Sequence, residues 1–313
     1  MTPQLLALDW GTSSLRAFLM CDGKISETRQ SGHGIQRLPQ PGIPGYEQAF
    51  AEIATDWLRQ WPQLPVVASG MVGSAQGWKE APYVRCPADI RALAEQGVSV
   101  PSGLGPDILI APGVLFDEAE QLPDVMRGEE IQIAGAFLLN PAWAERACML
   151  LPGTHSKWAL IENGLIVRYT TYLTGELFAV LKEHSILGRL MPTSAVTGFD
   201  PAAFELGLTT ARRSGPGDLS HQIFATRTLG LVGRLPPEAL ADYLSGLLIG
   251  HELVSGLAGV GDLDSRPLVM IGAPQLCERY ASSLKFMGRS ADAVIDNTAP
   301  AGLWNFAKAA RLI

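Results

Sequence analysis

The sequence predicts an α/β protein of two similar domains. One order of features occurs twice along the chain: an apolar strand, a G-T-x-S turn, a second strand and an Asx-Gly turn. The chain is 313 residues long and 47% hydrophobic, so it can bury two cores of ordinary domain size. Because the turn chemistry matches in the same order, we infer an internal duplication and expect the two copies to face each other.

The first copy occupies the N-terminus. Residues 5–8 form an apolar run, the polar residues 11–14 interrupt it, and a second apolar run covers residues 15–20. The Asp22-Gly23 pair favours a type I′ turn, because both central residues of that turn need a positive φ. We therefore expect a third strand that starts directly after the pair and runs back along the second strand.

The second copy begins with the segment "CMLLPGTHSKWALIENGLIV", residues 148–167. When the glycines of the two turns are aligned, the pair Asn163-Gly164 lies beside the place expected for the second tight turn. The identities in this alignment are Gly11 with Gly153, Thr12 with Thr154, Ser14 with Ser156 and Ala17 with Ala159.

Two G-T-x-S turns indicate two anion sites. Glycine allows close backbone approach, and successive amides with nearby hydroxyls form a concave site for phosphate. Asp9 precedes the first turn, whereas Leu151 takes its place in the second copy. A carboxylate beside a phosphate is repelled unless a cation lies between them, so we expect Asp9 to hold Mg²⁺, directly or through water. The alternative is an aspartate that caps its own turn.

Charge and cysteine usage exclude several classes of partner. The net charge of -7 comes from scattered acids, so no basic surface is available to a nucleic acid. The four cysteines lie far apart without metal-ligand spacing, which is typical of reduced thiols. No unbroken apolar stretch reaches about 18 residues and no basic leader is present, so we expect a cytoplasmic protein that is neither exported nor bound to a membrane.

A set of motifs resembles one known family. The motifs are "LDWGTSSLRA", "SGMVGSAQGWKEAPY", "MRGEEIQ", "LPGTHSKW" and "FATRTLGL". The two phosphate turns resemble those of the actin-like ATPase superfamily of sugar kinases, Hsp70 and actin, and the whole set resembles the 2-dehydro-3-deoxygalactonokinase family. The resemblance covers essentially the whole chain. It implies phosphorylation of the 6-hydroxyl of 2-dehydro-3-deoxy-D-galactonate by MgATP.

The resemblance also implies how the domains are organised. We expect two actin-like (ribonuclease H-like) domains, residues 1–140 and 141–313, with ATP and an anionic sugar acid in the cleft between them. The first domain would carry the sugar-acid pocket and the first phosphate turn, and the second would carry the other turn and the adenosine site. The residues assigned to phosphate binding are Gly11, Thr12, Ser13, Ser14, Gly153, Thr154, His155, Ser156 and Lys157.

The segment "GEEIQIAGAF", residues 128–137, is predicted to be a helix with two acids at its start. Acids in a first helical turn often do no more than favour the helix dipole. In the wider sugar-kinase group, an acidic residue after a glycine acts as the general base. By its place in the chain, the residue here that resembles it is Glu129, with Glu130 as second choice. Most relatives have Asp there, which makes this assignment a departure from the pattern. Arg127 is either a surface charge or a clamp for phosphate or carboxylate.

Two further residues of the second turn each have two alternative roles. Lys157 either steers a phosphate as a point charge or is an exposed lysine after a turn. His155 is expected to be structural rather than catalytic. The chain lacks GxxxxGK[ST], which argues against the P-loop class of nucleotide-binding proteins.

The substrate pocket needs a cation for the carboxylate and several hydroxyl partners. Residues 31–38 and 68–84 offer such groups on glycine-rich loops after apolar strands, with Trp78 as a wall for the sugar, although a glycine-rich loop is more often only a loop. The candidates are Arg16, His33, Gln36, Ser69, Gln76, Trp78, Lys79, Arg85 and Arg127.

Residues 267–284 are predicted to form a strand, a glycine turn and a helix, which a simple β-turn-α unit explains. In the superfamily this place carries the adenosine turn, and Gly272 and Ala273 match it, with alanine in place of the usual second glycine. Residues 299–312 are predicted to form an amphipathic helix that braces the hinge between the domains. Residues 244–253 are predicted to be a packing helix.

Three other functions stay open from the sequence. They are a kinase for another sugar acid, an actin-fold phosphohydrolase and a noncatalytic sugar sensor. A hydroxyl acceptor suits Glu129 better than hydrolysis does, and no DNA-binding segment fits before the first strand. The stereochemical preference and the oligomeric state, including a homodimer, are left open as well.

Overall fold

The computed structural model describes residues 2–192, 198–261 and 266–313. This part of the chain divides into two compact units. The first comprises residues 2–147, Ala159–Tyr169 and Asn297–Ile313, and the second comprises Cys148–Trp158 and the described residues of 170–296. The C-terminal segment thus packs with the first unit, and the expected domain limits at residue 140 stay a prediction.

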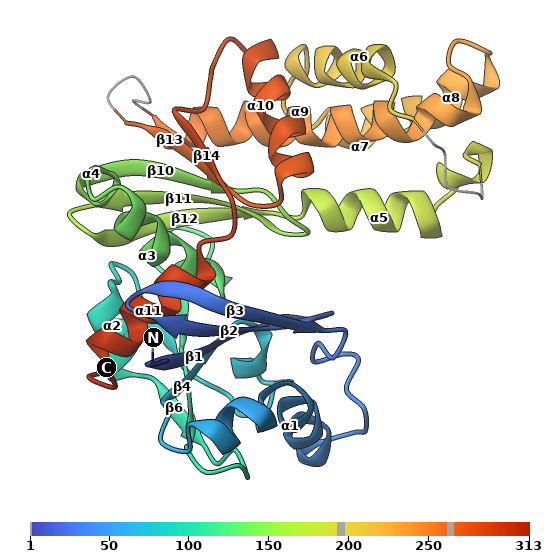
Figure 1. The fold of residues 1–313 in the computed structure, drawn as a ribbon. Helices are drawn as coiled ribbons and strands as arrows, with labels where there is room; N and C mark the ends of the chain where they lie inside the picture. The colour runs from blue at the N-terminus through green and yellow to red at the C-terminus, as the bar shows by residue number, and fades with distance from the viewer. Residues whose placement is uncertain (1, 193–197, 262–265) are drawn as a thin grey trace. The chain divides into compact units, whose positions relative to one another are not determined.

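The first unit contains a six-stranded sheet in the order β3-β2-β1-β4-β7-β6 (Figure 1). Its strands are β1 Leu5–Trp10, β2 Leu15–Cys21, β3 Lys24–Ser31, β4 Val66–Ser69, β6 Val98–Val100 and β7 Ile108–Ile110. β1 is antiparallel to β2 and parallel to β4. A smaller sheet has the order β5-β8-β9, with β5 Tyr83–Arg85, β8 Gly113–Phe116 and β9 Asp124–Met126.

The helices of the first unit are α1 Ile43–Gln60, α2 Ile90–Glu95, α3 Glu129–Leu139, α4 Ala142–Glu145 and α11 Ala299–Ala309, with a 3-10 turn at Met71–Gly73. Alternate residues of a strand point to opposite faces of a sheet. Leu6, Leu8 and Trp10 of β1 belong to the core cluster that α1 completes with Phe50 and Trp57. Asp9 points to the other face of the sheet, and α11 packs against β1, β4, α2 and α3.

The second unit contains the larger part of a five-stranded sheet in the order β12-β11-β10-β13-β14, in which the residues of β11 and β12 within 159–169 are assigned to the first unit. Its strands are β10 Arg146–Leu151, β11 Ser156–Glu162, β12 Leu165–Tyr172, β13 Leu268–Ile271 and β14 Ala293–Ile295. Its helices are α5 Thr174–His184, α6 Pro201–Arg212, α7 Leu219–Gln222, α8 Ala225–Leu231, α9 Leu240–Val260 and α10 Pro274–Phe286, with 3-10 turns at Gly188–Leu190 and Pro237–Ala239.

The two sheets repeat one strand order. β3-β2-β1-β4-β7 and β12-β11-β10-β13-β14 place equivalent strands at equivalent positions. The pairs β1–β4 and β4–β7 are parallel, and so are their counterparts β10–β13 and β13–β14. The topology therefore agrees with the duplication that the two turn motifs predict.

The tight turns also have the predicted conformation. Asp22 and Gly23 have φ values of 48° and 74°, and Asn163 and Gly164 have φ values of 51° and 78°. Positive φ at both central residues is the type I′ geometry, whose twist matches that of the flanking strands. The predicted helices at 128–137, 244–253 and 299–312 correspond to α3, α9 and α11, and the strand, turn and helix predicted at 267–284 correspond to β13 and α10.

The segment Pro237–Val260, which ends in α9, has the length and apolar composition of a membrane-spanning helix. In its most apolar window 61% of the residues are buried inside the protein, as expected for a core helix. Its glycines serve packing, because α6 crosses α9 so closely that a Cβ on Gly246 would lie 2.0 Å from the Phe204 carbonyl oxygen.

Candidate active site

Asp9 lies at the end of β1, between β2 and β4. It is opposite Arg16 on β2 and Ser69 on β4. The Arg16 guanidinium donates a hydrogen bond to Asp9 Oδ2 over 2.6 Å, and the Asn297 side chain gives another. Burial raises the pKa of Asp9, while Arg16 and Asn297 oppose this rise because both favour the ionised form. These two donors fix the carboxylate at the strand end.

The first G-T-x-S turn presents its hydroxyl groups to solvent. The Gly11 amide donates to the Ser14 carbonyl over 3.0 Å, which closes the turn. Thr12 and Ser13 are exposed. The Gln36 amide donates to the Thr12 carbonyl over 3.1 Å, so the loop after β3 lies directly against the turn.

Two glycines bring the start of α3 against the ends of β1 and β4. Gly70 and Gly128 have φ values of +95° and +109°, which other residues rarely adopt. A Cβ on Gly70 would lie 2.8 Å from the Trp10 carbonyl oxygen, and one on Gly128 would lie 3.4 Å from Gly70 Cα. The first turn of α3 therefore lies beside the strand end that carries Asp9.

The two glutamates at the start of α3 have different environments. Glu130 is 1% exposed, and both its carboxylate oxygens accept from the Gly128 amide, over 2.8 and 2.7 Å. Glu129 is only partly buried, and its Oε2 accepts from the Arg127 amide over 3.1 Å. Glu130 thus stabilises the glycine turn from inside the protein, whereas Glu129 is the glutamate that solvent reaches.

Burial and the neighbouring Glu129 raise the pKa of Glu130 to about 8, against an ordinary value of 4.5. Between the unfolded and the folded pKa, the folded chain keeps a proton that the unfolded chain has released. The free energy of unfolding therefore falls as the pH rises through that range. We expect Glu130→Gln to raise the free energy of unfolding above pH 8, by about 1 kcal/mol or more, because glutamine still accepts from the Gly128 amide and carries no charge. Urea unfolding of both proteins from about pH 5 to about pH 9 measures the difference. A difference that does not change with pH would contradict the protonation assigned to Glu130.

Arg127 is a buried cation. Its guanidinium lies 4.3 Å from the centre of the Tyr83 ring and donates to the Ala81 carbonyl over 2.8 Å. Its Nε and one terminal nitrogen have no hydrogen-bond partner among the described residues. A buried donor without a partner costs about 1–3 kcal/mol, so water or a ligand group is expected there. Both atoms are covered in this structure, so a substrate would reach them only after a local shift.

The predicted substrate residues do not all converge. Lys79 donates to the Ser99 carbonyl, Arg85 forms an ion pair with Asp117, and His33 faces Glu52. These three side chains are engaged with other groups of the first unit, and their role toward a substrate stays a prediction.

Trp78 does not form an exposed wall for a sugar. It is 6% exposed, and its ring lies 5.8 Å from the ring of Trp10 and 5.7 Å from that of Tyr46. Burial in this aromatic cluster stabilises the indole, and contact of Trp78 with a sugar stays a prediction.

Two of the predicted residues share a hollow. Gln36 and Gln76 line a hollow of about 540 Å³ together with Tyr46, whose hydroxyl donates to the Gln76 carbonyl over 2.8 Å. The hollow borders the first turn, because the Gln36 amide is bonded to Thr12. Ser69 lies apart from it, with a buried hydroxyl that has no partner among the described residues.

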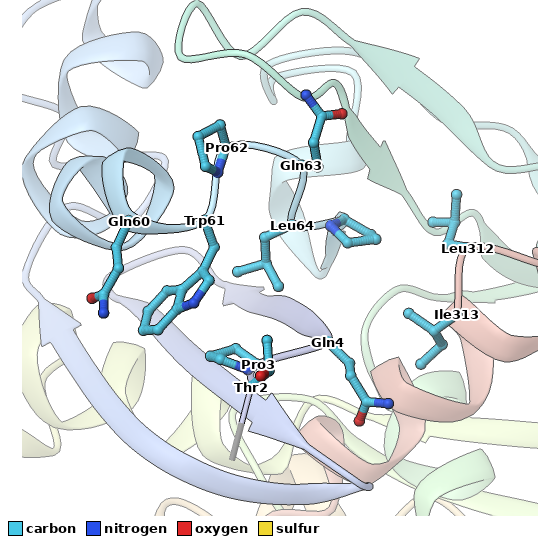
Figure 2. Close-up of a pocket in the computed structure, with 11 residues that line it drawn as sticks. Thr2, Pro3, Gln4, Gln60, Trp61, Pro62, Gln63, Leu64, Leu312 and Ile313 are labelled. Atoms are coloured by element: carbon cyan, nitrogen blue, oxygen red, sulfur yellow. The ribbon is translucent and has the colours of Figure 1, made fainter.

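A second hollow of the first unit does not belong to the candidate active site. It has a volume of about 570 Å³. Figure 2 shows it between Gln4, Trp61, Leu64 and Ile313. Gln4 immediately precedes β1, whereas Asp9 lies near the other end of that strand.

The second G-T-x-S turn divides into exposed and buried residues. Thr154 and His155 are exposed, and the His155 ring pairs with the Glu176 carboxylate. Ser156 and Lys157 are buried, and Lys157 Nζ donates to Thr171 Oγ1 over 2.8 Å. Lys157 is therefore not an exposed lysine, and the hydroxyl of Ser156 lies beneath the turn rather than on its surface.

The predicted adenosine turn lies next to the second phosphate turn. A Cβ on Gly272 would lie 3.4 Å from the carbonyl oxygen of Pro152, which precedes Gly153. Ala273 is exposed and leads into α10. A hollow of about 580 Å³ lies on α10, lined by residues that include Leu276, Arg279 and Phe199.

Two residues that contact these groups had no signal in the sequence. Asn297 hydrogen-bonds Asp9 from a segment that lies far away along the chain. Glu252 is buried in α9 among apolar residues, where the sequence indicates only a packing helix. Only the folded chain brings them to the two turns.

Asp9 fits a magnesium site by its chemistry. Within residues 2–192, 198–261 and 266–313, no three His, Cys, Asp or Glu side chains form a cluster that could hold a metal by themselves. Mg²⁺ is usually held by one or two carboxylates, by phosphates and by water. One oxygen of Asp9 is bonded to Arg16, and a carboxylate offers about four acceptor positions, so an acceptor remains for the ion or its water.

Comparison with known proteins gives one family. The profile described as 2-keto-3-deoxy-galactonokinase, DGOK, matches residues 9–306. The chain belongs to the 2-keto-3-deoxy-galactonokinase family. The 2-dehydro-3-deoxygalactonokinase of Escherichia coli (strain K12) is 36% identical to it over 312 residues, which are 99% of each chain.

Two solved structures are similar in fold. A Sinorhizobium meliloti protein provisionally named 2-dehydro-3-deoxygalactonokinase has a TM-score of 0.83 at 30% identity and covers 98% of both chains. Component A of the (R)-2-hydroxyglutaryl-CoA dehydratase of Acidaminococcus fermentans has a TM-score of 0.52 at 14% identity, over 99% of this chain and all of that one, and shows the fold alone. The predicted two-sheet actin-like fold and the predicted galactonokinase family are confirmed.

Proposed function

We propose that this chain is an ATP-dependent kinase that phosphorylates the 6-hydroxyl of 2-dehydro-3-deoxy-D-galactonate. The observation that carries the proposal is the 36% identity, over the full length of both chains, to the 2-dehydro-3-deoxygalactonokinase of Escherichia coli. The geometry of each unit supports a division of tasks among the residues.

The two G-T-x-S turns are the proposed phosphate sites. Each combines backbone amides with exposed side chains, from Thr12 and Ser13 in the first unit and from Thr154 and His155 in the second. Such turns bind anions without a P-loop lysine. Gly272 and Ala273 carry the adenosine, since Gly272 lies against the residue before the second turn.

Asp9 is the proposed metal ligand. Mg²⁺, when bound, neutralises the charge that develops on the phosphates. Arg16 and Asn297 orient the carboxylate, and both favour its ionised form against the rise in pKa that burial causes.

The hollow beside the first turn is the proposed sugar-acid pocket. Gln36 and Gln76 offer amide groups to the substrate hydroxyls. Arg16 is the more accessible cation for the carboxylate, and Arg127 is the buried one with unpartnered donors.

Glu129 is the proposed base. A general base must reach the attacking hydroxyl, and Glu129 is more accessible than Glu130, whose oxygens are both bonded to the Gly128 amide.

The proposed function is tested by ADP formation from purified protein and MgATP. We expect turnover that depends on 2-dehydro-3-deoxy-D-galactonate and is at least about tenfold lower in kcat/KM with the gluconate epimer, since the pocket must distinguish one hydroxyl configuration. ADP formation that is equal with and without sugar acid would contradict the kinase and indicate a phosphohydrolase. Turnover with only a different sugar acid would keep the kinase chemistry and reject the substrate.

A further inference from the structure

Glu252 is a buried carboxylate in the apolar helix α9 of the second unit. The residue is 2% exposed, and its neighbours in the helix include the buried Leu248 and Leu253. A carboxylate is retained in such a place only when donors surround its oxygens. The identity of those donors therefore indicates what Glu252 does.

Three neutral side chains donate to Glu252. Trp158 Nε1 donates to Oε1 over 2.9 Å, and the Tyr280 hydroxyl donates to Oε2 over 2.6 Å. The Thr174 hydroxyl also donates to Oε2. Burial raises the pKa of Glu252, and these three donors, together with Ser156, oppose that rise because each of them favours the carboxylate.

The three donors come from three elements that surround the second phosphate turn. Trp158 lies on β11, which begins at the end of the turn. Thr174 is the first residue of α5, and Tyr280 lies on α10, which follows the Gly272-Ala273 turn. One carboxylate thus connects the elements on which the proposed nucleotide site depends.

A directional chain of hydrogen bonds leads from the turn to Glu252. The Tyr280 hydroxyl donates its proton to Glu252, so its oxygen accepts from Ser156 Oγ, which lies 3.0 Å away. Ser156 Oγ in turn accepts from the Gly153 amide over 3.4 Å. The carboxylate at the end of the chain sets the orientation of both hydroxyls, and the first residue of the turn is held from beneath.

The start of α5 touches the same turn. A Cβ on Gly175 would lie 2.6 Å from the Gly153 carbonyl oxygen, so the helix and the turn are in backbone contact. The Glu176 amide donates to the Thr154 carbonyl over 3.0 Å. Because Thr174 anchors this helix start to Glu252, a shift of the carboxylate moves the N–H groups of α5 and the turn together.

We propose that Glu252 is the positioning residue of the second phosphate turn, which it holds in its nucleotide-binding shape through Ser156, Tyr280 and Thr174. The proposal rests on the proposed function, because that function makes the turn a phosphate site. Glu252 itself does not touch ATP. It acts through the turn and through the first residues of α5.

The test is Glu252→Gln. The amide NH₂ of glutamine must face either the Trp158 N–H or the two hydroxyls, so at least one donor loses its acceptor. We expect the Kd for MgADP, measured by calorimetry, and the KM for ATP to rise about tenfold. The KM for the sugar acid should stay within about twofold of its original value, because that pocket belongs to the other unit.

Asp242→Asn is the matched control. Asp242 is also a buried acid on α9, and its carboxylate accepts from the Asp200 amide over 2.9 Å, away from the turn. This variant should melt at a lower temperature and keep the original Kd for MgADP. If Glu252→Gln likewise only melts earlier and binds MgADP as tightly as the unchanged protein, Glu252 is merely structural and the proposal is wrong.

Tyr280→Phe provides a second variant in case Glu252→Gln does not fold. It keeps the buried ring and removes the hydroxyl that joins Ser156 to Glu252. The Kd for MgADP should rise at least about threefold, and an unchanged Kd would overturn the proposal. MgADP binding by a protein that phosphorylates no sugar acid would reject the proposed function and leave the positioning role to be decided by the same Kd values.

Discussion

Asp9→Asn is expected to lower kcat by about three orders of magnitude while the protein stays folded. Asparagine preserves the shape of the side chain and its contact with Asn297, but it has no negative charge with which to hold Mg²⁺. Steady-state turnover over a series of Mg²⁺ concentrations measures the loss, and circular dichroism checks the fold. The Mg²⁺ concentration for half-maximal activity should rise as well.

Asp22→Asn is the control for that experiment. Asp22 occupies the tight turn between β2 and β3 with a positive φ, which asparagine also tolerates. The same chemical change at this place should leave turnover as it is. Near-normal turnover of Asp9→Asn would remove Asp9 from the metal site and leave it as an aspartate that pairs with Arg16.

Glu129→Gln is expected to lower kcat by about two orders of magnitude, a smaller loss than that from Asp9→Asn. Positioning and charge neutralisation carry most of phosphoryl transfer, so the remaining groups still support slow turnover without the base. The KM for ATP should change little, because Glu129 is proposed to act on the attacking hydroxyl, whereas the adenosine turn belongs to the other unit. Initial rates at saturating ATP and sugar acid measure the effect.

Glu130→Gln distinguishes the two glutamates. It makes the same change one residue further along α3, at a side chain whose oxygens are occupied by the Gly128 amide. We expect it to keep most of the turnover. If Glu130→Gln abolishes turnover and Glu129→Gln does not, the base is Glu130 and the assignment from exposure is wrong.

The strands and tight turns could be predicted because their causes are local. Asp22-Gly23 and Asn163-Gly164 each carry their turn preference in two adjacent residues, and both adopt it. The duplication could be recognised because the turns recur with the same chemistry, and the two sheets do share one strand order.

The surroundings of the site could not be predicted, because they depend on contacts between distant segments. Ser156 occupies the position of a phosphate-binding hydroxyl in the turn motif. It is nevertheless buried, with Tyr280 from a helix far along the chain beneath it. The sequence around Trp78 suggests an exposed sugar wall, but Trp10 and Tyr46 pack against its ring in the folded chain. Asn297 reaches Asp9 only after the last segment of the chain folds onto the first unit.

The identity of the product tests the central claim most directly. Purified protein is incubated with MgATP and 2-dehydro-3-deoxy-D-galactonate, and the product is examined by phosphorus NMR and mass spectrometry. We expect one equivalent of ADP and a sugar acid with a phosphate ester on its 6-oxygen. Inorganic phosphate together with an unmodified sugar acid, or an ester at another oxygen, would contradict it.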